Sequence, residues 1–252
     1  MLNNTGEKTV KVAIHVWQDA NGNGNFPENQ ATIDGLTQSV SYLSNDMWTY
    51  NDAPSDPIYG IPFISDTKLR ADLVGVYFHQ NQTIFDNQCA NMTAMNNAAI
   101  AAYPEVERCI NLHIARPTCW NNDNSYANYV ATPNYDAHSS VRTKARPDQP
   151  PVPAHYGGIW SHEIGHLLGL WHTYQFLTQN EHCVRSHDDF LEDVYGDGPE
   201  DQPWCNAPVA PCEVCLHDIS WNCDVNDPSN SCTNNMMGGT SSSGYFSPLQ
   251  IG

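Results

Sequence analysis

The stretch His162-Glu-Ile-Gly-His-Leu-Leu-Gly-Leu-Trp-His172 holds three histidines, one glutamate and two glycines at spacings typical of a catalytic metal site. Four residues separate His162 from His166, so on a helix their imidazoles project from one face, about one turn apart. Two imidazoles placed in this way can bind one small cation. Glu163 lies about 100° further round such a helix, where it meets a water held by the metal rather than the metal itself.

The second half of this stretch supplies a third ligand. Gly169 can take a positive φ angle, which ends the helix and turns the chain back so that His172 reaches the same ion. Three neutral imidazoles leave one tetrahedral position of a zinc ion open for water, as in catalytic sites. A chance match to all five positions is on the order of one in ten thousand for a chain of this composition. The sequence therefore predicts zinc bound by His162, His166 and His172.

Length and charge limit the possible partners. The 252 residues suffice for one large domain or two modest ones with a sizeable core. Ten Lys and Arg against 28 Asp and Glu give a formal net charge of −18. Such a surface repels nucleic acid and anionic membranes, and no apolar run approaches the length of a membrane span. We therefore expect neither nucleic acid nor a membrane as a partner.

The nine cysteines indicate disulfide bonds, because six of them fall in the last third, where hydrophobic periodicity is poor. We expect a secreted, extracellular protein, although the first residues lack the apolar run of a signal peptide. Cys212 and Cys215 could belong to a zinc ribbon or a redox pair. Because no second CxxC accompanies them, membership in the disulfide network is favoured. Nine is odd, so one thiol is free or its partner lies in a missing segment.

Hydrophobic periodicity predicts an α/β (α+β) fold with a twisted mixed sheet, two helices in the N-terminal half and an irregular, disulfide-rich C-terminal half. An amphipathic helix is expected over 31–48, and the helix of the metal ligands is expected to begin near Ile159 or Trp160. No period is evident over 116–156. Strands are predicted over 10–17, 72–78 and 109–115.

The segment Asp19-Ala-Asn-Gly-Asn-Gly-Asn25 resembles the start of a calcium loop. The bidentate acid expected at the twelfth position of such a loop is Gln30 here, which argues against an EF-hand. A turn built on Gly and Asn is the favoured interpretation.

The pattern His162-Glu-x-x-His166-x-x-Gly169-x-x-His172 is the signature of the metzincin zinc peptidases, and the chain resembles that family. The family carries a second mark, a methionine turn beneath the metal. Asn234-Asn-Met-Met-Gly238, followed by Tyr245-Phe-Ser-Pro-Leu-Gln-Ile-Gly252, looks like that turn and the start of the last helix.

Three local features make the sequence most similar to the pappalysin-like group of metzincins. They are Leu168-Gly-Leu-Trp-His-Thr173, the acidic run Asp189-Phe-Leu-Glu-Asp193 after Cys183, and the Asn-Asn-x-Met-Gly form of the turn. The resemblance implies one catalytic domain over 1–252. An upper subdomain of 1–169 would end at the zinc helix, and a lower subdomain of 170–252 would hold the methionine turn, with the active-site cleft between them.

The resemblance also implies a function, that of a secreted zinc-dependent endopeptidase that acts as a monomer on protein or peptide substrates. Zinc would be held by His162, His166 and His172, and Glu163 would act as the general base that activates the zinc-bound water. Met237 would be the turn methionine, with Met236 as the alternative. The resemblance further suggests a Cys183–Cys223 disulfide and a structural calcium site that includes Asp189 and Asp193.

The chain departs from the family after the methionine turn. Many relatives have a tyrosine two residues after the methionine, where this chain has Gly239, or Gly238 in the shifted register. An acidic residue that some relatives place shortly after the turn is also missing, which puts a preference for Arg or Lys in doubt. The alternative function is a catalytically inactive zinc-binding or adhesion module, against which the intact Glu163 argues. A third reading is a disulfide-rich binding domain with an accidental motif.

Overall fold

The computed structural model describes residues 6–49, 64–88, 92–116, 125–127, 140–144, 151–168 and 170. The chain divides into two compact units. One unit comprises Gly6–Trp48 and Lys68–Gly169 and contains the described sheet and α-helices. The other comprises Met1–Thr5, Thr49–Thr67 and Leu170–Gly252. The described part is a mixed α/β fold, so this coarse prediction is confirmed.

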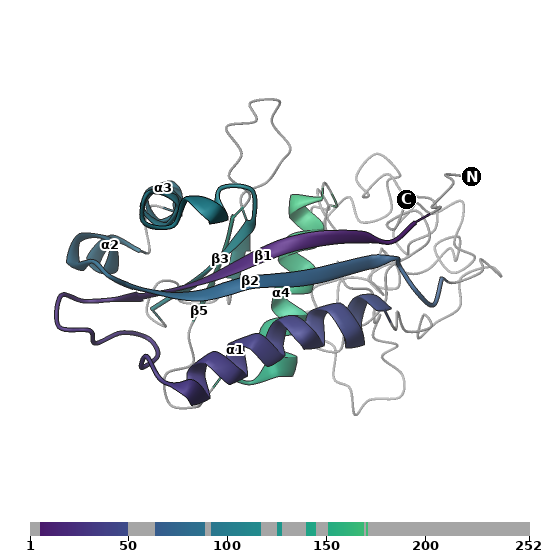
Figure 1. Cartoon of the computed structure of the whole chain (residues 1–252), viewed down its shortest axis with the longest axis horizontal. Coiled ribbons are helices and arrows are strands. Elements are labelled where there is room, and N and C mark those ends of the chain that lie inside the picture. The colour runs from purple at the N-terminus through teal and green to yellow at the C-terminus, as the bar shows by residue number, and fades with distance from the viewer. Residues whose placement is uncertain are drawn as a thin grey trace, which may run out of the picture. The chain divides into compact units, whose positions relative to one another are not determined.

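A mixed sheet forms the centre of the first unit (Figure 1). Its strand order is β2-β1-β3-β5-β4, in which β4 is antiparallel to β5 and the other neighbours are parallel. The three predicted strands correspond to β1, β2 and β3, whereas β4 and β5 fall in the stretch without evident periodicity. The strands are β1 (Lys8–Gln18), β2 (Leu69–Gln80), β3 (Ile110–Ala115), β4 (Ser125–Ala127) and β5 (Ser140–Lys144).

The prediction of two helices was wrong, because the described residues contain four α-helices. The helix expected over 31–48 is divided into α1 and a π-helical segment, η1. The helix of the metal ligands begins at Pro153 rather than near Ile159, since proline at the first helical position has a φ angle that suits a helix. The helices are α1 (Gln30–Tyr42), η1 (Leu43–Thr49), α2 (Gln82–Asn87), α3 (Met92–Ala102), the 3₁₀-helix η2 (Pro104–Val106) and α4 (Pro153–Leu167).

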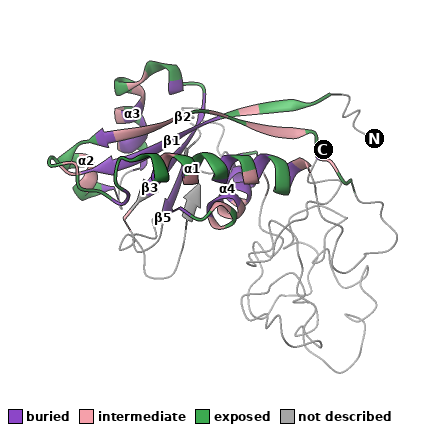
Figure 2. Cartoon of the chain, turned by 60° about the horizontal axis from the view of Figure 1, so that its bottom comes forward, coloured by how far each residue is buried: buried purple, intermediate pink, exposed green. Residues whose placement is uncertain are grey.

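Helices cover both faces of the sheet. In Figures 1 and 2, α2 and α3 lie on one side of the strands, and α1 and α4 lie on the other. On the first face Trp17 of β1 packs with Met95 and Ala99 of α3. Alternate residues of a strand point to opposite faces, so β1 contributes to both interfaces. Both sets of β1 side chains are fully buried, namely Val12, Ile14 and Val16 in one set and Ala13, His15 and Trp17 in the other.

The pairing of β1 with β2 contains a β-bulge. Val12 pairs with Leu73, but Ala13 pairs with Gly75, so Val74 is an additional residue in β2. The bulge shifts the alternation of β2 by one residue relative to β1. After it, Tyr77 and His79 of β2 pair with odd-numbered residues of β1.

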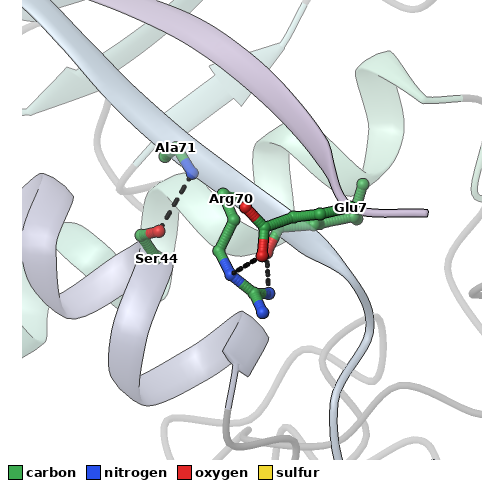
Figure 3. Close-up of polar contacts among 5 residues, drawn as sticks. Glu7, Ser44, Arg70 and Ala71 are labelled. Atoms are coloured by element: carbon green, nitrogen blue, oxygen red, sulfur yellow. Dashed lines mark hydrogen bonds and ion pairs between the residues drawn. The ribbon is translucent and has the colours of Figure 1, made fainter.

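An ion pair and a hydrogen bond lie at one end of β1 and β2 (Figure 3). Arg70 Nε lies 3.2 Å from Glu7 Oε2, and the backbone N–H of Ala71 donates to Ser44 Oγ at 3.0 Å. The Glu7 side chain is 58% exposed, and an ion pair so exposed contributes at most about 1 kcal/mol.

The segment Asp19–Asn25 forms a turn, as its Gly and Asn content favours. Asp19 Oδ1 accepts hydrogen bonds from the backbone N–H groups of Asn21 and Asn23, both at 2.8 Å, and its Oδ2 accepts one from Asn23 Nδ2 at 3.2 Å. Gly22 has a φ angle of 80°, in the left-handed region that glycine enters without penalty. The hydrogen bonds from the backbone and side chain of Asn23 lower the pKa of Asp19.

Candidate metal centre

Helix α4 places His162 and His166 on one face, as their spacing predicts. Their ring centroids are 4.7 Å apart, the ring planes are at 88°, and the two Nε2 atoms lie 3.1 Å apart. At this distance one Nε2–H can donate to the other Nε2. Two imidazoles bound to one tetrahedral zinc at 2.0–2.1 Å would have nitrogens about 3.3 Å apart. The separation of the two nitrogens is therefore close to that of two ligands of one zinc ion.

Burial distinguishes this face of α4 from an ordinary helix surface. His166 is 3% exposed and Glu163 is 6% exposed, while His162 is half-buried. A glutamate is almost never buried to this extent unless its carboxylate has a partner. The structure therefore brings a buried carboxylate and two imidazoles together within two turns of one helix.

Two indole hydrogen bonds hold α4 immediately before His162. Trp160 Nε1 donates to Thr143 Oγ1 of β5 at 3.0 Å, and Trp48 Nε1 donates to Ser161 Oγ at 2.8 Å. Both indole side chains are buried. One bond attaches α4 to the sheet and the other attaches it to η1, so the two bonds restrict rotation of the helix about its axis.

The packing of α4 on α1 is closest at Gly157. A Cβ atom added there would lie 2.7 Å from Tyr42 Cδ1 and 2.8 Å from the carbonyl oxygen of Ser39. A Cβ added at Gly158 would meet nothing within 4 Å. Gly157 thus permits the close approach of the two helices, and this contact lies one to three turns before the two histidines.

Several predicted site residues lie outside the described residues. Within the described residues, no group of three or more His, Cys, Asp and Glu side chains is arranged to hold a metal ion. The predicted residues that are not described are Gly169, His172, Cys183, Asp189, Asp193, Cys223, Met236, Met237, Gly238 and Gly239.

The structure also gathers three histidines that the sequence did not connect. His15, His79 and His113, here called the histidine cluster, come from β1, β2 and β3 and are all buried. No short spacing in the sequence relates them to one another. His15 and His113 fall within the predicted strands 10–17 and 109–115, and His79 directly follows the predicted strand 72–78. The order of the strands in the sheet was needed to bring the three together.

Comparisons with known proteins assign no family to this chain. No protein-family model and no curated protein matches the sequence. Among solved structures that match, one described as "Structure of a chaperone-substrate complex" is similar over 68% of this chain, at 12% sequence identity and a TM-score of 0.34. The match covers 25% of that chain, and a likeness at this TM-score supports no conclusion about function. No helix among the described residues is long and apolar enough to cross a membrane.

Proposed function

We propose that this chain is a secreted zinc-dependent endopeptidase of the metzincin type, most similar to the pappalysin-like group. The observation that carries the proposal is the pair of imidazoles on α4, with Nε2 atoms 3.1 Å apart and Glu163 buried beside them. The continuation of the sequence to Gly169 and His172 supports a third ligand. The mixed sheet with α4 packed against it agrees with the fold that the resemblance implies.

The donor set suits zinc. His162, His166 and His172 would hold the ion through neutral imidazole nitrogens, which zinc prefers together with thiolates and carboxylates. When bound, zinc polarises a peptide carbonyl and lowers the pKa of a water towards about 7. Met237 would form the apolar floor of the site, and calcium bound at Asp189 and Asp193 would have a structural role.

Glu163 carries the proton transfers in this proposal. Its carboxylate takes a proton from water as the water oxygen bonds to the peptide carbonyl carbon. It then transfers that proton to the amine nitrogen as the carbon–nitrogen bond breaks, which returns Glu163 to its ionised form. Substrates would be extended segments of proteins or peptides, and the net charge of −18 attracts basic ones.

The proposal is tested by measuring casein cleavage and zinc content on the purified chain and on Glu163→Gln. Glutamine keeps the size of the side chain but cannot take the proton. We expect about one zinc per chain in both proteins, and a fall in cleavage rate of about 10²- to 10⁴-fold in the variant. Glu28→Gln is the matched control, because Glu28 is exposed and lies outside α4. It should cleave casein like the parent.

Each result has a distinct meaning. If the parent chain binds no zinc, the metal site is wrong. If both proteins bind zinc and neither cleaves casein or a broad peptide library, the inactive zinc-binding or adhesion module replaces the enzyme. Removal of zinc from an active chain with a chelator should abolish cleavage, and added zinc should restore it.

A further inference from the structure

The histidine cluster lies on the sheet face that α3 covers. His15 is the register partner of both Tyr77 and His113 on the neighbouring strands. The ring centroid of His15 lies 5.1 Å from that of His79 and 4.9 Å from that of His113. His15 and His113 are fully buried, and His79 is 7% exposed. The ring of His15 thus contacts both of the other imidazoles, away from water.

The hydrogen bonds of His15 fix its protonation state. Asn111 Nδ2 donates to Asn96 Oδ1 and to the Val106 carbonyl, so its Oδ1 faces His15 Nε2 as an acceptor at 2.9 Å. His15 Nε2 must therefore carry a hydrogen. In a neutral ring the other nitrogen, Nδ1, is then an acceptor, and it receives the N–H of His79 Nε2 at 2.9 Å.

His113 is fixed in the same way by Trp17. An indole nitrogen can only donate, so His113 Nδ1 accepts from Trp17 Nε1 at 3.3 Å. The hydrogen of the neutral His113 ring is then on Nε2, which is buried and has no hydrogen-bond partner within the described residues. The proton-accepting nitrogens of His15 and His113 are therefore both occupied by donors. A proton added to either would turn an acceptor into a donor that faces another donor.

One buried charge beside the cluster favours a neutral ring further, because Arg142 of β5, the register partner of His113, is buried and its positive charge lowers the pKa of His113. On the same face of β1, the exposed Lys11 has Asp72 as its register partner. The carboxylate of Glu105 on η2 accepts a hydrogen bond from the hydroxyl of Tyr77 at 3.4 Å. Cys109 is buried on the same side of the sheet, in a cluster against which Tyr77 packs.

Burial lowers the pKa of His15 to about 4 and that of His79 to about 3, and it lowers the pKa of His113 well below 6.5. An unfolded chain would protonate the same rings near pH 6.5. The cluster therefore stabilises the folded state above pH 6.5, and this stabilisation is lost as the pH falls from about 6.5 towards 4.

We propose that the histidine cluster is an acid-sensitive switch that holds α3 against the sheet at neutral pH and releases it in acid. The connection to α3 is direct, since His15 bonds Asn111 and Asn111 bonds Asn96 of α3. The ring of Tyr103, just after α3, also contacts His79 edge-on at 5.3 Å. The switch does not rest on the proposed peptidase activity. The cluster shares a face of β1 with Trp17, which packs against α3, and α3 and α4 lie on opposite sides of the strands (Figure 1).

Hydrogen-exchange protection of α3, measured on the full chain between pH 7.5 and 4, tests the switch. The variant is the double change His79→Gln and His113→Asn, which keeps a donor towards His15 and an acceptor for Trp17 but removes two protonatable rings. We expect α3 to lose protection on acidification in the parent, and the midpoint to move lower by on the order of one pH unit in the variant. His155→Asn, which removes a histidine of α4, should keep the parent midpoint. An unchanged midpoint in the double variant would overturn the proposal.

A second measurement decides the matter should the double variant fail to fold. Ring-proton NMR of the parent chain reports the ionisation of each histidine directly. We expect the three cluster rings to stay neutral down to the pH at which α3 loses protection. Titration of His15 and His113 near pH 6.5, with α3 still protected, would overturn the proposal.

Discussion

The indole N–H of Trp48 donates to the hydroxyl of Ser161 at 2.8 Å, across 113 residues of sequence. Trp48 lies near the end of η1, and Ser161 directly precedes His162 on α4. This buried bond therefore couples the segment after α1 to the helix that carries the candidate metal ligands.

Loss of this bond should destabilise the fold. Trp48→Phe retains an aromatic ring but leaves the buried Ser161 hydroxyl without its donor, so we expect the free energy of unfolding to fall by about 1–3 kcal/mol. Urea denaturation measures the change. In a double-mutant cycle with Ser161→Ala, the two losses should add to more than the loss of the double variant. Strictly additive losses would mean that the bond contributes nothing in solution.

Two adjacent glycines of α4 should respond to alanine in opposite ways. Gly157→Ala places a methyl group 2.7 Å from Tyr42 and should cost about 1–3 kcal/mol through overpacking. Gly158→Ala meets no atom within 4 Å and should stabilise the helix by about 0.5–1 kcal/mol. Thermal unfolding of the two variants gives the comparison. Equal melting temperatures would contradict the close approach of α1 and α4 at Gly157.

Stability should decrease in mild acid. The pKa of His15 is lowered from 6.5 to about 4 in the folded chain, so the unfolded chain binds more protons between these values. Linkage then predicts a loss of about 2–3 kcal/mol from His15 alone by pH 4.5. Urea midpoints measured from pH 7.5 to 4.5 should fall throughout that range. A urea midpoint that stays constant between pH 6.5 and 4.5 would contradict the conclusion that the His15 ring is neutral in the folded chain.

Cys109 should be a slow nucleophile in the native protein. It is a free thiol, it is 5% exposed, and burial raises its pKa. The thiolate is the reactive form, so iodoacetamide at pH 8 should leave Cys109 unmodified until urea is added. Peptide mapping by mass spectrometry identifies the modified residue. Alkylation of Cys109 in native buffer at the rate of a small-molecule thiol would show that its thiol is accessible to solvent in the native protein.

Local patterns predicted the strands better than the helices. β1 and β3 carry runs of β-branched and apolar residues whose alternation is visible in sequence. The sequence does not predict α3, because Asn96 is buried at a position where a helical pattern calls for an apolar residue. The Oδ1 of Asn96 accepts from Asn111 Nδ2 of β3, and its Nδ2 has no hydrogen-bond partner among the described residues. The first turns of α4 were missed because Gly157 and Gly158 argue against a helix. The close packing of Gly157 against α1 outweighs the low helix propensity of these two glycines.

The candidate site could be predicted where its residues are close in sequence. The spacing of His162 and His166 alone placed their rings on one face of a helix. The supports of that helix come from Trp48 and Thr143, which no local pattern relates to it. The histidine cluster could be predicted even less from local patterns, because its members become neighbours only when three strands are placed side by side.

The extra residue Val74 determines the chemistry of an entire layer. A side chain's face alternates along a strand, so without the bulge Tyr77 and His79 would pair with even-numbered residues of β1 and point towards α1 and α4. Imidazole and phenol groups would then replace apolar side chains in a dry interface, and His15 would lose its donor. The register shift at this one unpaired residue thus sets which face of the sheet every later side chain of β2 occupies.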